Sequence, residues 1–126
     1  MTPDLHRAAR LAAKTLLRFE VNALPVDPAA LLRRIPGARL MSFRQARDLL
    51  PPSQQWALDS YTLLDAALLM GEAGWLILYR RDLPLPQRRY NFAHELGHLA
   101  CRHGGGLHEP WQEAEADCFA RHLLVP

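Results

Sequence analysis

The stretch that decides the fold is residues 88–99, RRYNFAHELGHL, which contains HELGH at positions 94–98. On an α-helix, His94 and His98 fall about 40° apart and therefore share one face. Apolar side chains lie roughly opposite the two histidines: Phe92, Leu96, Leu99 and Ala100. Such a helix can bury its back in the core while it turns both imidazoles toward a cleft. We expect it to run from about Gln87 to Arg102.

The motif is of the His-Glu-x-x-His type, whose two histidines suit a shared zinc ion. Zinc with three protein ligands keeps a fourth position for water and lowers the pKa of that water toward neutrality. Glu95 adjoins the first ligand and can accept the proton, which makes it the candidate catalytic base. The motif alone leaves open a plain alternative, two surface histidines beside an ordinary glutamate.

A third ligand is expected from the last helix, which begins near Pro110 and runs to about Leu124. Its acidic residues are Glu109, Glu113, Glu115 and Asp117, and its apolar stripe is Ala116, Phe119, Ala120, Leu123 and Leu124. Glu113 falls within the arc of that stripe, and a carboxylate there needs a partner to offset its desolvation. We therefore predict Glu113 as the third metal ligand.

Asp117 stands one turn after Glu113, at the edge of the same arc. From there it can accept the free ring N–H of a ligand histidine, which would fix the tautomer of that ring. The alternative for Glu113 and Asp117 is a solvated acidic helix start, favoured by the helix dipole. Glu115 points well away from the apolar stripe and fits this surface interpretation better than a metal site.

The other histidines and cysteines are weaker candidates. We expect His103 to cap the C-terminus of the motif helix, with a role near the cleft as its alternative. His108 is expected at the surface, with a place along the cleft as its alternative. His6 and His122 are predicted at the surface. Cys101 lies on the ligand face, but a small buried thiol is the favoured interpretation.

Upstream, the pattern predicts helices and a small sheet. The expected elements are an amphipathic helix over 5–20, a short helix from Pro28 to about Arg34 capped by Asp27, a strand over 38–43, a polar segment over 44–55 with a helical turn, and a hairpin of strands 66–70 and 75–79. This is an α+β fold, with helices around a small antiparallel or mixed sheet and the motif helix packed on the C-terminal ligand-bearing helix.

Length and composition limit the classes of function. At 126 residues the chain is expected to form a single domain, residues 1–126. The net charge is only +2 and the arginines are scattered, so direct nucleic-acid binding is not expected. The two cysteines form no scaffold spacing and no apolar run approaches the length of a membrane span, so we expect a cytoplasmic protein without a membrane segment.

Residues 88–99, together with EAEADCFARHLLVP at 113–126, resemble the ImmA/IrrE family of metallopeptidases. Members of that family are typically bacterial or phage proteins with a gluzincin-like zinc site, and they cleave or inactivate helix-turn-helix repressors. The resemblance implies His94, His98 and Glu113 as ligands and Glu95 as the general base. The sequence departs from the family pattern at Asp117, where Asn is common, and at Tyr90-Asn91, where Phe-Thr is more usual.

The predicted function is therefore that of a zinc-dependent endopeptidase which cleaves a regulatory protein in a bacterial or phage stress or mobile-element switch. The expected substrate is a helix-turn-helix repressor or an antitoxin. The ligand types suit Zn²⁺ best but would also accept Mn²⁺ or Fe²⁺. Two alternatives stay open: a metal-stabilised module that binds a repressor without cleaving it, and a helical scaffold without metal.

Overall fold

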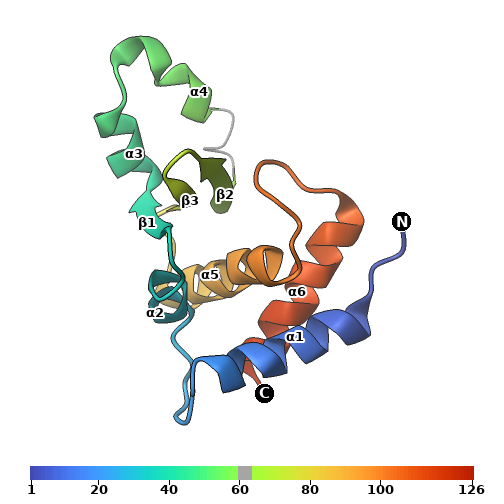
Figure 1. Cartoon of the computed structure of the whole chain (residues 1–126). Coiled ribbons are helices and arrows are strands. Elements are labelled where there is room, and N and C mark those ends of the chain that lie inside the picture. The colour runs from blue at the N-terminus through green and yellow to red at the C-terminus, as the bar shows by residue number, and fades with distance from the viewer. Residues whose placement is uncertain (60–63) are drawn as a thin grey trace.

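The computed structural model describes residues 1–59 and 64–126 and shows an α+β fold (Figure 1). Its elements, in chain order, are α1 (Leu5–Arg18), α2 (Pro28–Arg33), β1 (Ala38–Ser42), α3 (Phe43–Leu49), the 3₁₀ turn η1 (Pro52–Gln54), α4 (Trp56–Asp59), β2 (Ala66–Gly71), β3 (Gly74–Tyr79), α5 (Leu85–Ala100) and α6 (Pro110–Leu124). The predicted helix starts at Pro28 and Pro110 are confirmed, and Asp27 caps α2 by accepting a hydrogen bond from the Ala30 amide.

The sheet is mixed and has the strand order β1-β3-β2. β2 and β3 form the predicted antiparallel hairpin, in which Leu68 pairs with Ile77. β1 pairs with β3 in parallel, with Leu40 opposite Ile77. β3 is therefore the central strand, and β2 lies at one edge of the sheet.

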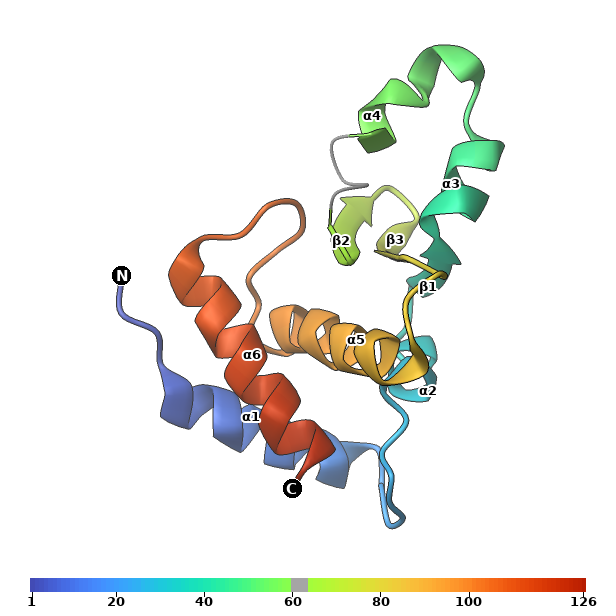
Figure 2. The same cartoon turned by 180° about the vertical axis from the view of Figure 1, so that it is seen from behind.

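Helix α5 lies between the sheet and the pair formed by α1 and α6 (Figures 1 and 2). Phe92 and Leu96, on the back of α5, are buried in the main core, as their spacing from the histidines predicts. α1 contributes Ala8 and Ala12 to the same core and packs along α6. The motif helix is thus held on both sides, which fixes the direction in which its histidines point.

Helices α5 and α6 are in close contact at Gly97, inside the motif. A Cβ atom at this position would lie 3.0 Å from the Ala116 carbonyl oxygen and 3.1 Å from the Phe119 ring. Real Cβ atoms are rarely so close to backbone atoms, so the glycine lets the two helices approach. This contact sets the distance between the histidines of α5 and the carboxylates of α6.

A second, smaller core lies under an arm formed by α3, η1 and α4, which extends away from the other helices (Figure 1). The sequence predicted only a helical turn within residues 44–55, which underestimates α3. The helix begins at Phe43 because Ser42 and Gln45 form a reciprocal capping box, with both hydrogen bonds at 3.0 Å. In the described part of the chain, no helix is both long and apolar enough to span a bilayer.

Candidate metal centre

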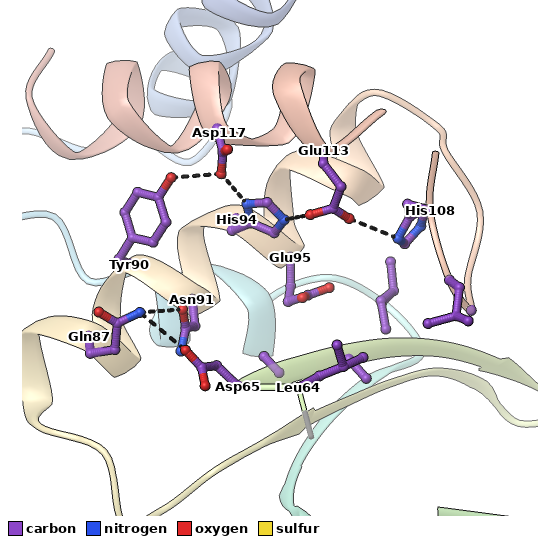
Figure 3. Close-up of a pocket in the computed structure, with 15 residues that line it drawn as sticks. Leu64, Asp65, Gln87, Tyr90, Asn91, His94, Glu95, His108, Glu113 and Asp117 are labelled. Carbon is purple, nitrogen blue, oxygen red and sulfur yellow. Dashed lines mark hydrogen bonds and ion pairs between the residues drawn. The ribbon is translucent and has the colours of Figure 1, made fainter. Parts of the chain in front are cut away.

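Three side chains of α5 and α6 converge on one point. The Nε2 atoms of His94 and His98 are 3.1 Å apart, and both face the carboxylate of Glu113. Glu113 places Oε2 at 2.9 Å from His94 Nε2 and Oε1 at 3.1 Å from His98 Nε2. Figure 3 shows His94 and Glu113 approaching from the two helices. These three residues are the ones that the sequence predicted as ligands.

The geometry of this group fits a tetrahedral zinc ion. Bonds of about 2.0–2.1 Å to zinc place the donor atoms roughly 3.3 Å from one another. The three separations here, 2.9 to 3.1 Å, are slightly shorter, as expected where hydrogen bonds hold the same atoms. Two imidazoles and one carboxylate are also the ligand types of catalytic zinc sites with an open fourth position.

Asp117 lies behind His94, as predicted. Its Oδ1 is 2.8 Å from His94 Nδ1, the ring nitrogen that faces away from Glu113. The same oxygen accepts a hydrogen bond of 2.7 Å from the Tyr90 hydroxyl. A carboxylate in this place keeps the proton of His94 on Nδ1 and leaves Nε2 free to bind a metal. Tyr90 was not predicted to take part, and it holds Asp117 in position.

Glu95 is buried beside this group, with 5% of the residue exposed. Its Oε2 atom has no hydrogen-bond partner among the described residues. Burial raises the pKa of the Glu95 carboxyl to about 7, while the neighbouring His94 works in the opposite direction. An unpaired buried carboxyl with a pKa near neutrality is suited to take up and release a proton.

The site opens into a cleft of about 680 Å³ between β2, α5, α6 and the loop that joins these two helices. Asn91 lines this cleft one turn before Glu95; its Oδ1 accepts a hydrogen bond from Gln87, and its buried Nδ2 has no partner in the described part of the chain. His108 also lines the cleft and stacks on His98, with the ring centroids 3.7 Å apart. His108 therefore takes its alternative position along the cleft, and the favoured surface prediction was wrong.

The protonation of the ligand group follows from its contacts. Hydrogen bonds with His94 and His98 lower the pKa of Glu113, so this carboxylate is ionised at neutral pH. Burial lowers the pKa of His98 to about 4, so this ring is neutral. Burial opposes protonation of His94 too, but the hydrogen bond with Glu113 and the nearby carboxylate charges together raise its pKa.

The predicted surroundings of two acidic residues on α6 differ from the observed ones. The side chain of Glu113 is 46% exposed, so it lies at the mouth of the cleft and not within the core. Glu115, which was predicted at the surface, is only 3% exposed. The physical reason is α1, which covers the face of α6 that carries Glu115, so that this face is buried as well.

His103 was predicted to cap α5, and this was wrong. Its ring is buried, with Nδ1 at 2.8 Å from His98 Nδ1 and Nε2 at 2.7 Å from Glu115 Oε1. The chain reverses direction at Arg102, which has a φ of 60°, and this turn places the His103 ring between His98 and Glu115. Cys101 is buried as predicted, and burial raises the pKa of its thiol to about 11.

One signal in the sequence could have indicated that Glu115 is buried. Trp111 and Cys118 flank it at i−4 and i+3 and form a second apolar stripe on α6. A helix with apolar residues on two faces is covered on two sides. His103 carries no comparable signal, because its position depends on a turn beyond the end of the helix.

One of three comparisons with known proteins gave a match. Neither the curated proteins nor the solved structures gave a match to the chain. The family model of the IrrE N-terminal-like domain, peptidase family M78, matches residues 45–126, about two thirds of the chain. This region holds the HELGH motif and all of α6 but not α1 or α2. The chain belongs to the family of IrrE N-terminal-like domains, and its fold is that of a metallopeptidase-like domain.

Proposed function

We propose that the protein is a zinc-dependent endopeptidase which cleaves a regulatory protein, with a helix-turn-helix repressor or an antitoxin as its cytoplasmic substrate. The observation that carries the proposal is the unpaired, buried carboxyl of Glu95 beside the His94, His98 and Glu113 group. A site that only held the fold together would have no need of this carboxyl, since burying it without a partner costs stability. Membership of a peptidase family supports the same conclusion.

In this proposal His94, His98 and Glu113 would hold the ion, which would supply Lewis-acid chemistry to a water molecule and to the peptide carbonyl. Glu95 accepts a proton from the attacking water through Oε2, its free oxygen. The same carboxyl then gives the proton to the amide nitrogen of the leaving strand.

The cleft offers an extended polypeptide a backbone partner. β2 is an edge strand, and the Leu68 carbonyl on its outer edge already accepts a hydrogen bond of 2.8 Å from the Gly106 amide. Alternate residues of a strand point their backbone groups to the same side, so Ala66 shares the outer edge with Leu68. Ala66 also lines the cleft. The loop that carries Gly106 occupies the edge at Leu68, so a substrate strand can add to the sheet at Ala66 and pass across the ligand group.

The test is the substitution Glu95→Gln, which keeps the shape of the side chain and removes its ability to accept a proton. We expect the variant to retain stoichiometric zinc and to cleave a helix-turn-helix repressor substrate 10²- to 10⁴-fold more slowly, roughly the contribution of a general base. The measurements are the metal content of the purified protein and the rate of repressor cleavage. Glu72→Gln, in the exposed turn between β2 and β3, is the matched control and should leave both unchanged.

Three results would contradict the proposal. If Glu95→Gln cleaved the repressor at the wild-type rate, Glu95 would not be the base. If wild type and variant bound the repressor equally and neither cleaved it, the protein would be a metal-stabilised binding module. If the purified protein contained no stoichiometric metal, the proposal that His94, His98 and Glu113 form a metal site would be wrong.

A further inference from the structure

The second ring nitrogen of His98 has a buried partner of its own. His98 presents Nε2 to the ligand group, and its Nδ1 lies 2.8 Å from Nδ1 of His103. The other nitrogen of His103, Nε2, lies 2.7 Å from Glu115 Oε1. The three side chains are 1%, 2% and 4% exposed, respectively. They form a continuous hydrogen-bonded row that runs from the ligand group to Glu115, on the face of α6 that α1 covers.

The row has one consistent arrangement of protons when His98 binds a metal. A neutral histidine that coordinates through Nε2 carries its proton on Nδ1 and donates it. His103 must then accept at Nδ1, so its own proton is on Nε2 and is donated to Glu115. Every nitrogen in the row has a partner, and the row ends on a carboxylate. His94 has the same arrangement in shorter form, because its Nδ1 faces Asp117 directly.

The far end of the row is fixed by the first turn of α1. The backbone N–H of Asp4 donates to Glu115 Oε2 at 2.7 Å, and an Arg7 guanidinium nitrogen lies 4.0 Å from Oε1. Arg7 also donates a hydrogen bond to the Cys101 carbonyl at 3.3 Å. These contacts hold the carboxylate in one orientation. They come from a segment outside the region that the family model matches.

A competing interpretation is a second metal site, because Cys101, His103 and Glu115 also bring potential ligand atoms together. Both ring nitrogens of His103 already have hydrogen-bond partners, so a metal would have to break one of these bonds. The Arg7 guanidinium beside Glu115 would repel a cation. The geometry therefore favours a hydrogen-bonded support over a second ion.

We propose that His103 and Glu115 are positioning residues, which hold the ring and tautomer of the metal ligand His98 and thereby raise the affinity of the site for zinc. This inference rests on the proposed metal site. Partners of ligand histidines typically change metal affinity about 10- to 100-fold when they are replaced. His98 is thus supported by a carboxylate through an intervening histidine, whereas His94 contacts its carboxylate directly.

The experiment compares the variants His103→Leu, His103→Gln and Glu115→Gln with wild type. The Kd for Zn²⁺ is measured by competition with a chelator, and the visible spectrum of the Co²⁺-loaded protein reports the ligand geometry. We expect His103→Leu and Glu115→Gln to weaken zinc binding about 10- to 100-fold and to alter the Co²⁺ spectrum. His103→Gln, whose amide can accept from His98 and donate to Glu115, should recover most of the affinity.

Cys101→Ala is the matched control, because Cys101 belongs to the competing metal group but not to the row. It should leave the Kd for zinc and a stoichiometry of one ion unchanged. If the wild type bound two ions and Cys101→Ala only one, the second-site interpretation would replace this proposal.

The outcomes separate this inference from the proposed function. If wild type binds no zinc, both fall together. If wild type binds zinc and cleaves its substrate while the three variants keep the wild-type Kd, only the positioning role is overturned, even where the melting temperature of the metal-free variants drops. Should His103→Leu fail to fold, the isosteric Glu115→Gln still decides the question through its Kd.

Discussion

At the scale of single residues, the buried carboxyl of Glu95 lowers the stability of the fold and is the proposed catalytic base. Its carboxyl is buried, and its Oε2 has no hydrogen-bond partner in the described ranges, 1–59 and 64–126. Folding therefore favours the protonated form and raises the pKa. The consequence is a stability that depends on pH in a direction set by this one group.

The first prediction concerns metal-free protein. Because the folded pKa of Glu95 is raised from 4.5 to about 7, the stability that goes with its protonated form is present below pH 4.5 and is lost as the pH rises through 7. Relative to Glu95→Gln, the metal-free wild type should lose about 3 kcal/mol of unfolding free energy over this interval. Urea unfolding of both proteins at pH 4.5 and pH 8 measures the difference. A constant difference between the two pH values would contradict it.

How far residues could be predicted from the sequence depended on the range of the interactions. His94, His98 and Glu113 were predicted to lie together because helical periodicity and motif spacing are local properties, but the side chain of Glu113 is 46% exposed and does not lie within the buried arc that the periodicity indicated. Glu115 was misplaced because its surroundings depend on α1, which lies about a hundred residues earlier in the chain. His103 was misplaced because its position depends on the turn at Arg102, beyond the end of α5. Periodicity within one helix cannot show which other element covers its second face.

At the scale of elements, the contact between α5 and α6 sets the ligand geometry. It passes through Gly97, whose lack of a side chain allows the Ala116 backbone and the Phe119 ring to approach. Separation of the two helices would move Glu113 away from both histidines. Packing and metal binding are therefore coupled at this glycine.

The second prediction is that Gly97→Ala destabilises the protein by about 1–3 kcal/mol, although alanine is normally the better helix former by about 1 kcal/mol. The reason is the added Cβ, which would lie 3.0 Å from a backbone oxygen that cannot move away easily. Zinc affinity should fall as well. Thermal unfolding and chelator competition measure the two effects, and unchanged values for both would show that the helices tolerate the extra methyl group.

In the sheet and the arm too, sequence patterns predicted local features better than contacts between distant segments. The β2–β3 hairpin was predicted because its turn and its two apolar runs are adjacent in sequence. The parallel pairing of β1 with β3 joins segments more than thirty residues apart, and no local pattern indicates it. The length of α3 was underestimated for another reason. Its signal, the capping box of Ser42 and Gln45, is local, but Ser42 was assigned to the predicted strand 38–43.

At the scale of the whole molecule, apolar packing and metal binding are separate sources of stability, although the ligand His98 is itself buried. The main cluster of buried apolar side chains is built from α1, α2, α5, α6 and the sheet, and it needs no ion in order to pack. The fold should therefore persist without metal. Bound zinc would add to a stability that is already present.

The third prediction follows from this separation. At a free Zn²⁺ concentration about a hundredfold above its Kd, binding adds about 2.7 kcal/mol, which corresponds to a rise in Tm of roughly 10 °C. A chelator should return the Tm to the metal-free value without abolishing the cooperative transition, as calorimetry would show. Mg²⁺ should have no effect, because it prefers oxygen ligands. Loss of the transition on chelation would mean that the ion is required for folding.

The packing of α1 against α6 also has a consequence during synthesis. The apolar face of α1 leaves the ribosome first, but α6, which covers it, is made about a hundred residues later. At roughly 5–20 residues per second, this face stays uncovered for about 5–20 seconds. Until α6 emerges, the apolar face of α1 is therefore accessible to chaperones, and the folding of α6 completes the core and the metal centre together.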